Sequence, residues 1–189
     1  MAKSTLNKNM IEGQIKPING MSEELLSIFN SLDRNDFMPE AMKEMSYVEK
    51  NIILQDKRTI LKPSLIAQIA LSINLKANEN VLILGSTTGY LSAILSHLAE
   101  TVIVVEENER LLSNSENAIK KNNINNVVFM KNEIVKGYDE QSPFNAIIIE
   151  GAIQKIPKNI IDQLDEEGRL FAIVPVSYTH LTLPTILLV

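Results

Sequence analysis

Short apolar runs alternate with amphipathic stretches through the second half of the chain. Their length and their content of valine and isoleucine are typical of strands buried on both faces of a sheet. These predicted strands lie at Asn80 to Leu84, Thr101 to Val105, Val127 to Met130, Ala146 to Ile149 and Arg169 to Val174.

Helical spacing of apolar residues occupies the gaps between these strands. One stripe runs from Leu91 to Leu98, a second helix is predicted around Glu109 to Lys121, and a short helix begins at Pro157. Strands that alternate with helices predict an α/β fold with a doubly wound, mostly parallel sheet. In such sheets ligands bind at the carboxyl ends of the strands.

The first part of the chain is predicted to be mainly helical. Ser22 is a suitable N-cap for a helix that runs to about Leu32, and the following stretch breaks at Pro39. Residues 46–62 are mixed, so we expect irregular or weakly stranded structure there. Pro63 suits the first turn of another helix with a buried face.

Composition indicates one globular domain of ordinary size. The chain has 189 residues, of which 45% are hydrophobic and 22% charged. We assign residues 1–175 to a single domain, with a helical region at 1–75 and the sheet at 76–175.

Several classes of function are disfavoured by composition. The chain contains no cysteine, and its two histidines are His97 and His180, so we expect no disulfide, no thiolate nucleophile and no metal site. A net charge of −5 argues against a nucleic-acid partner, which requires a basic surface. We find neither an apolar run long enough to span a membrane nor a signal peptide, and therefore expect a cytoplasmic protein with no membrane partner.

The most informative segment joins two predicted strands through a glycine-containing turn. The strand VLIL leads into the turn GSTTGY, and the next strand VIVV ends on Glu106. Gly85 and Gly89 allow backbone N–H groups to face an anionic ligand group, and Glu106 lies about 20 residues after Gly85, at the spacing of a ribose-binding carboxylate. Thr87 stands between the two glycines. The pattern predicts a pocket for a nucleotide cofactor.

The C-terminal segment differs from the rest of the chain. Residues 176–185, VSYTHLTLPT, resemble the translation of a transposase adapter used in sequencing libraries. We therefore interpret residues 176–189 as a non-native tail and expect the sheet to be incomplete, with Arg169 to Val174 as an unpaired edge.

A series of motifs resembles the protein-L-isoaspartate O-methyltransferases, which are class I S-adenosylmethionine-dependent enzymes. Taken singly the motifs are weak, but they occur in the order typical of that family. They are MIEGQIKP, FMP, SYVE, VLILGSTTGY, VVEEN, FNAIIIEGA and IPKNIIDQLDEEGRL.

The resemblance implies a cofactor, a substrate class and a set of site residues. The cofactor would be S-adenosyl-L-methionine, and the substrate a carboxylate of a damaged peptide or protein. Arg58 would bind the substrate carboxylate, and Thr59 and Leu61 would line the substrate side. The implied cofactor residues are Gly85, Ser86, Thr87, Gly89, Glu106 and, on the adenine side, Glu133.

The chain departs from the family pattern at several of these places. Ile83 replaces an acid before the first glycine, and Thr87 replaces a glycine, so we expect its side chain to crowd the ligand or to forbid a backbone angle that only glycine tolerates. Leu61 replaces a serine whose hydroxyl is associated with the substrate carboxylate. These differences predict a divergent branch with weak or absent isoaspartyl activity.

Two other interpretations stay open beside an active methyltransferase. One is a catalytically inactive binding protein of the same fold, which Ile83 and Thr87 favour, or else a methyltransferase with a different substrate. The other is a nicotinamide-dependent oxidoreductase, which shares the strand, turn and ribose acid but lacks visible residues for hydride chemistry.

Overall fold

A six-stranded sheet forms the centre of the protein in the computed structural model, which describes the backbone of residues 5–178 and 181–188 and the side chains of residues 5–174. The strand order is β5-β4-β3-β6-β7-β8. Neighbouring strands from β5 to β7 run parallel, and β8 runs antiparallel to β7. The strands are β3 (Asn80–Leu84), β4 (Thr101–Glu106), β5 (Val127–Lys131), β6 (Phe144–Ala152), β7 (Leu164–Tyr178) and β8 (Leu181–Leu188).

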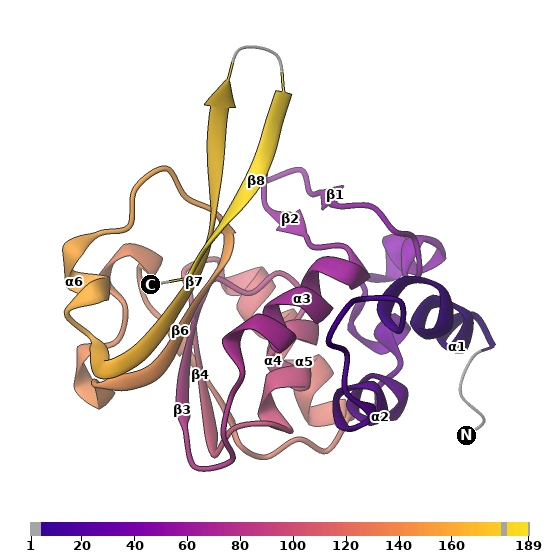
Figure 1. Cartoon of the computed structure of the whole chain (residues 1–189), viewed down its shortest axis with the longest axis horizontal. Coiled ribbons are helices and arrows are strands. Elements are labelled where there is room, and N and C mark those ends of the chain that lie inside the picture. The colour runs from indigo at the N-terminus through magenta and orange to yellow at the C-terminus, as the bar shows by residue number, and fades with distance from the viewer. Residues whose placement is uncertain (1–4, 179–180, 189) are drawn as a thin grey trace.

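Helices cover both faces of this sheet, as a doubly wound fold requires. Figure 1 shows α3 (Pro63–Ile73), α4 (Tyr90–Ser96) and α5 (Glu109–Lys121) on one side of the sheet and α6 (Lys158–Ile161) on the other. The strand order reverses direction between β3 and β6, which makes their carboxyl ends the expected ligand-binding position.

The N-terminal region packs on the same face as α3, α4 and α5. Most of its buried residues join one hydrophobic cluster with those three helices and with alternate residues of the strands. Met38, Ile52, Leu54 and Ile60 form a separate small cluster with Leu111 of α5. The region consists of α1 (Thr5–Met10), η1 (Ile11–Ile15), α2 (Glu23–Ser31), η2 (Arg34–Phe37), η3 (Glu40–Met45) and the short antiparallel pair β1 (Ile52–Ile53) and β2 (Thr59–Ile60). The opposite face has a smaller cluster, to which α6, η4 (Ile134–Lys136) and the segment before η5 (Asp139–Gln141) contribute.

Local sequence signals account for most element boundaries. The Ser22 side chain accepts a hydrogen bond from the backbone N–H of Leu25 and caps α2, as predicted. Pro63 occupies the first turn of α3, and Asn74 ends that helix with a left-handed φ of 48°. The predicted strand from Asn80 and the predicted helix from Glu109 have the observed bounds of β3 and α5.

The expectation of an unpaired edge at β7 is wrong. Strand β8 pairs antiparallel with β7 along residues 171–178, and the two strands extend together past the rest of the sheet (Figure 1). Strand β7 also begins at Leu164, earlier than predicted, because backbone pairing with Phe144 of β6 starts there. Backbone hydrogen bonding rather than side-chain pattern decides both features.

Long apolar helices do not occur in the described part of the chain. None of its helices has the length and hydropathy needed to cross a bilayer.

Candidate cofactor and substrate site

The turn after β3 needs both of its glycines. Gly85 and Gly89 have φ values of 86° and 80°, which side-chain-bearing residues rarely adopt. A Cβ atom at Gly89 would also lie 3.1 Å from the carbonyl oxygen of Ser115. Gly89 thus allows the start of α4 to pack closely against α5.

Thr87 does not strain this turn, which corrects one expectation from the sequence. Its φ is not positive, so no backbone angle reserved for glycine is needed there. The Thr87 side chain is buried, and its Oγ1 donates to Oε1 of Glu150 at 2.7 Å. Thr87 therefore holds a neighbouring carboxyl group.

Glu106 ends β4 at the position expected of a ribose-binding acid. Its side chain is fully buried. The backbone N–H of Ser86 donates to Oε2 at 2.8 Å, and the backbone N–H of Asn108 donates to Oε1 at 2.8 Å. The carboxylate is thus held by the glycine turn on one side and by the start of the next helix on the other.

Arg58 supplies the remaining partners of Glu106. Its Nη1 donates to Oε1 at 3.0 Å and its Nη2 to Oε2 at 2.7 Å, which is the two-point geometry favoured by a guanidinium and a carboxylate. We call this the Arg58–Glu106 pair. The sequence predicts Arg58 on the substrate side and Glu106 on the cofactor side, and the structure brings them into direct contact.

The guanidinium of Arg58 lies directly over the glycine turn. A Cβ atom at Gly85 would be 2.7 Å from Nη2 of Arg58, 3.4 Å from the carbonyl oxygen of Glu150 and 3.7 Å from Cδ1 of Ile134. The group therefore lies where the carboxyl ends of β3, β4 and β6 meet. Ile134 and Glu150 were not among the predicted site residues.

Glu150 is a second buried carboxyl at this end of the sheet. Burial raises its pKa to about 7, although hydrogen bonds from Thr87 and the charge of Arg58 act in the opposite direction. Its Oε2 has no hydrogen-bond partner among the described residues. An acid that directly follows the apolar run AIII was the sequence signal that could have found it.

Arg34 lies beneath the substrate side of the site. It is buried, its Nη2 donates to the carbonyl oxygen of Leu61 at 2.7 Å, and its guanidinium lies 5.2 Å from the centre of the Tyr90 ring. Burial lowers the pKa of Arg34 and raises that of Tyr90. Within the described part of the chain, Nε and Nη1 of Arg34 and the Tyr90 hydroxyl lack hydrogen-bond partners.

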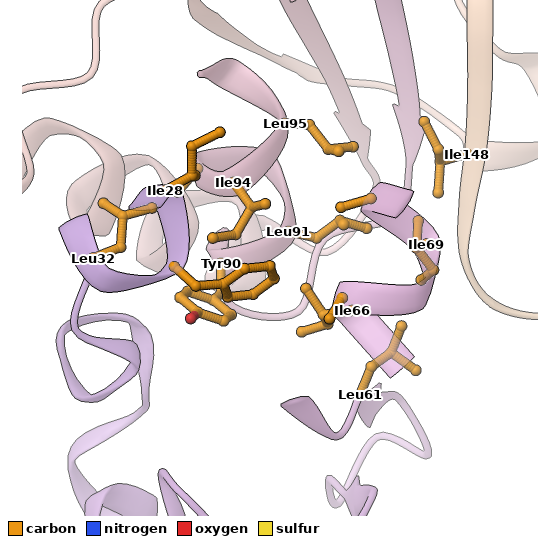
Figure 2. Close-up of a cluster of buried hydrophobic side chains, with 14 of the residues drawn as sticks. Ile28, Leu32, Leu61, Ile66, Ile69, Tyr90, Leu91, Ile94, Leu95 and Ile148 are labelled. Carbon is orange, nitrogen blue, oxygen red and sulfur yellow. The ribbon is translucent and has the colours of Figure 1, made fainter. Parts of the chain in front are cut away.

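The other predicted site residues have varied surroundings. Ser86 is buried, and its Oγ donates to Oγ of Ser115 at 3.0 Å. Thr59 is half-buried in β2. Leu61 is 3% exposed, and Figure 2 shows it among apolar side chains such as Ile66 and Ile69.

Glu133 differs from the rest because it is exposed. Its carboxylate pairs with Lys136 at 2.6 Å, and the neighbouring residue Ile134 lies nearer the glycine turn. The functional roles assigned to these residues from the sequence stay predictions.

A surface cavity also borders Thr87. Its volume is about 310 Å³. It lies between residues 36–40 and α5, and Thr87 is the one member of its lining that also belongs to the predicted cofactor residues.

Comparison with known proteins identifies the family. The family model described as protein-L-isoaspartate(D-aspartate) O-methyltransferase matches residues 4–183. The chain belongs to this family. The resemblance inferred from the motifs is confirmed, as are the Rossmann-like α/β fold and the methyltransferase class of enzyme. Enzymes of the protein-L-isoaspartate O-methyltransferase family use S-adenosylmethionine, so the predicted cofactor is confirmed for the family.

Individual relatives of this methyltransferase cover most of the chain. A protein-L-isoaspartate O-methyltransferase 1 from Syntrophobacter fumaroxidans is 31% identical over 167 residues, which are 88% of this chain and 77% of the relative. A protein-L-isoaspartate O-methyltransferase from Aliivibrio fischeri strain MJ11 is 31% identical over 155 residues, covering 82% of this chain and 74% of that protein.

Solved structures of methyltransferases share the fold. A protein-L-isoaspartate O-methyltransferase matches with a TM-score of 0.78 at 22% identity, over 89% of this chain and 55% of that one. A Plasmodium falciparum structure described as a beta-aspartate methyltransferase, in complex with S-adenosyl-L-homocysteine, matches with a TM-score of 0.75 at 22% identity. This second match covers 97% of this chain and 87% of that one.

Proposed function

We propose that this protein is an S-adenosylmethionine-dependent methyltransferase that esterifies an isoaspartyl carboxylate in damaged peptides or proteins. The observation that carries the proposal is the buried carboxylate of Glu106, held at the end of β4 beside the glycine turn. This is the position at which an acid of a parallel sheet accepts hydrogen bonds from a ribose.

The residues at the site suit this cofactor in part. The turn between Gly85 and Gly89 leaves the backbone open to a ligand, and Glu106 has the right charge and position. Both oxygens of Glu106 are, however, already engaged by Arg58, so a ribose must replace that side chain.

The proposed reaction needs no general base from the protein. A carboxylate acceptor with a pKa near 4 is already ionised at neutral pH. S-adenosylmethionine, when bound, supplies an electrophilic methyl group. The protein contributes position and exclusion of water, and the family resemblance assigns Thr59 and Leu61 to the substrate side and Arg58 to the substrate carboxylate.

Two measurements test the proposal. Calorimetric titration with S-adenosyl-L-homocysteine measures cofactor binding, and transfer of labelled methyl to an isoaspartyl peptide measures activity, with the matching aspartyl peptide as control. Ester formation on the isoaspartyl peptide alone supports the proposal. Absence of nucleoside binding at millimolar ligand refutes it.

A second candidate is a methyltransferase of the same cofactor but another acceptor. Leu61 favours it, because this side chain is buried in the core and offers no hydroxyl to a substrate carboxylate. Loss of one such partner costs about 1 to 3 kcal/mol, which slows turnover by one to two decades. Tight binding of S-adenosyl-L-homocysteine without esterification of isoaspartyl peptide distinguishes this candidate.

Location is a separate prediction. The cytoplasmic location expected from the sequence stays a prediction, which fractionation of the source cells checks.

A further inference from the structure

We propose that the Arg58 side chain occupies the cofactor site when no nucleoside is bound. Arg58 leaves Glu106 when a nucleoside binds, and its charge then becomes available to the carboxylate of the substrate. This inference rests on the proposed function and adds a coupling between the cofactor and the substrate. Arg58 would make the binding of each favour the binding of the other.

A ribose and Arg58 compete for the same acceptor atoms of Glu106. Glu106 accepts four hydrogen bonds, and two come from the backbone N–H groups of Ser86 and Asn108. These two donors belong to the turns that build the pocket. The other two come from the Arg58 side chain, so only Arg58 can be exchanged for the hydroxyls of a ribose.

A nucleoside and Arg58 also compete for the space beside Gly85. Nη2 of Arg58 lies 2.7 Å from the place a Cβ atom would take at Gly85. A nucleotide reaches this turn because glycine has no side chain, and Arg58 fills the room that glycine leaves. A nucleoside and the Arg58 guanidinium therefore cannot occupy this place together.

The segment that carries Arg58 is a short hairpin. Its backbone is held by a two-residue pairing, in which Ile53 faces Thr59 and Ile52 faces Ile60. The backbone N–H of Leu54 donates to the carbonyl oxygen of Arg58 at 2.8 Å, and the connecting turn has its φ of 63° at Lys57. Ile52, Leu54 and Ile60 are buried, whereas residues 55–57 at the tip are exposed, so the tip can open locally while the buried side chains stay packed.

An exposed salt bridge also joins this segment to α5. Asp56 pairs with Arg110 at 3.0 Å, and the Arg110 side chain is 59% exposed. Such a pair stabilises little. Arg110 thus provides a matched control, since it is an arginine that contacts the same segment without entering the cofactor site.

Release of Arg58 changes what the site offers to a substrate. While paired, the guanidinium is neutralised by Glu106 and only 22% of its side chain is exposed. Once a ribose takes its place, Arg58 no longer has the Glu106 carboxylate as its hydrogen-bond partner. A carboxylate on an incoming peptide is the partner that this cation lacks.

Calorimetry with S-adenosyl-L-homocysteine tests the proposal on wild type, Arg58→Ala, Arg58→Gln and Arg110→Ala. We expect Arg58→Ala to bind about tenfold more tightly than wild type, Arg58→Gln to lie between them, and Arg110→Ala to match wild type. Thermal melting of each variant verifies folding, and Arg58→Gln keeps a hydrogen-bond donor in case Arg58→Ala unfolds.

The coupling between the nucleoside and the peptide is measured by repeating the nucleoside titration with peptide present. With an isoaspartyl peptide present, we expect wild type to bind S-adenosyl-L-homocysteine several-fold more tightly, and the Arg58 variants to show no such gain. Hydrogen exchange across residues 52–60 of wild type should rise when the nucleoside binds.

The outcomes separate this inference from the proposed function. Equal or weaker nucleoside binding by both Arg58 variants overturns the inference, while binding by wild type keeps the proposed function. If neither wild type nor the folded Arg58 variants bind the nucleoside, the inference and the proposed function are both overturned, because removal of Arg58 would then not have opened the site.

Discussion

Both ends of the sheet hold a glutamate paired with an arginine, and their surroundings differ. At the amino end, Arg169 of β7 donates to both oxygens of Glu79, with one contact of 3.1 Å, and its Nε donates to the carbonyl oxygen of Ile73 at 2.7 Å. At the carboxyl end, the Arg58–Glu106 pair lies over the glycine turn. The first pair joins β7, α3 and the start of β3, whereas the second joins a short hairpin to the candidate site.

Both pairs consist of an arginine and a glutamate, so the position of each pair in the fold decides its role. The hydrogen bonds of Arg169 named above join β7 to the end of α3 at Ile73 and to Glu79 just before β3, so the Arg169–Glu79 pair stabilises the fold. Arg58 comes from a segment that can withdraw, and Glu106 is the acid that a ribose requires. The carboxyl end also contains Glu150, a buried acid with no arginine hydrogen-bonded to it among the described residues.

Breaking the amino-end pair should have the largest effect on stability. We expect Arg169→Ala to lower the free energy of unfolding by about 3 kcal/mol, because Glu79 and the end of α3 lose their partner together. Arg58→Ala should cost clearly less, and nucleoside affinity should be unchanged by Arg169→Ala. Urea unfolding of both variants measures this, and equal losses would contradict the distinction between the two pairs.

The pH dependence of stability should have opposite signs at the two ends. Burial raises the pKa of Glu150 to about 7, so the folded state binds its proton more tightly than the unfolded state and its stabilisation is lost as pH rises from about 4.5 to 7. Hydrogen bonds with Arg169 and Lys76 outweigh burial and lower the pKa of Glu79, so its stabilisation is present above pH 4.5 and lost as pH falls below it.

Glu150→Gln isolates the first of these effects. We expect this variant to gain on the order of 3 kcal/mol over wild type between pH 4.5 and pH 8, because its side chain stays neutral. Urea unfolding at a series of pH values measures the difference. A constant difference across this range would mean that Glu150 does not titrate in the folded protein.

Removing the carboxylate of Glu106 should weaken binding of the nucleoside. We expect Glu106→Ala to weaken binding of S-adenosyl-L-homocysteine by about tenfold or more, since a charged hydrogen-bond acceptor is lost. Glu79→Ala is the control, because it removes the corresponding acid at the other end of the sheet. Calorimetry decides, and unchanged affinity in Glu106→Ala would rule out the ribose role.

The smallest expected effect concerns the hydroxyl beside Glu150. Thr87→Val keeps the shape of the side chain but removes the hydrogen bond to Oε1. We expect a loss of about 1 kcal/mol in the free energy of unfolding at neutral pH. The pKa of Glu150 should rise further, which the pH series on this variant can measure. A stability equal to wild type would show that the hydroxyl is not needed there.

Much of the fold could be predicted from local pattern. The bounds of β3 and α5, the cap at Ser22 and the start of α3 at Pro63 follow from apolar periodicity and from residues that end or begin helices. The family and its cofactor also followed from motifs, because their order along the chain survives at about 30% identity. Pairing of β8 with β7 did not, since backbone hydrogen bonding carries no side-chain signal.

The sequence by itself determined that a glycine turn and Glu106 belong to one strand-turn-helix-strand unit, because short-range spacing sets that geometry. Only the tertiary structure decided what Glu106 contacts. Arg58 is 48 residues away along the chain and Glu150 lies on β6, and both reach the turn because β3 has β4 and β6 as neighbours. Contacts of this kind depend on how distant segments pack together, so the spacing of residues cannot reveal them.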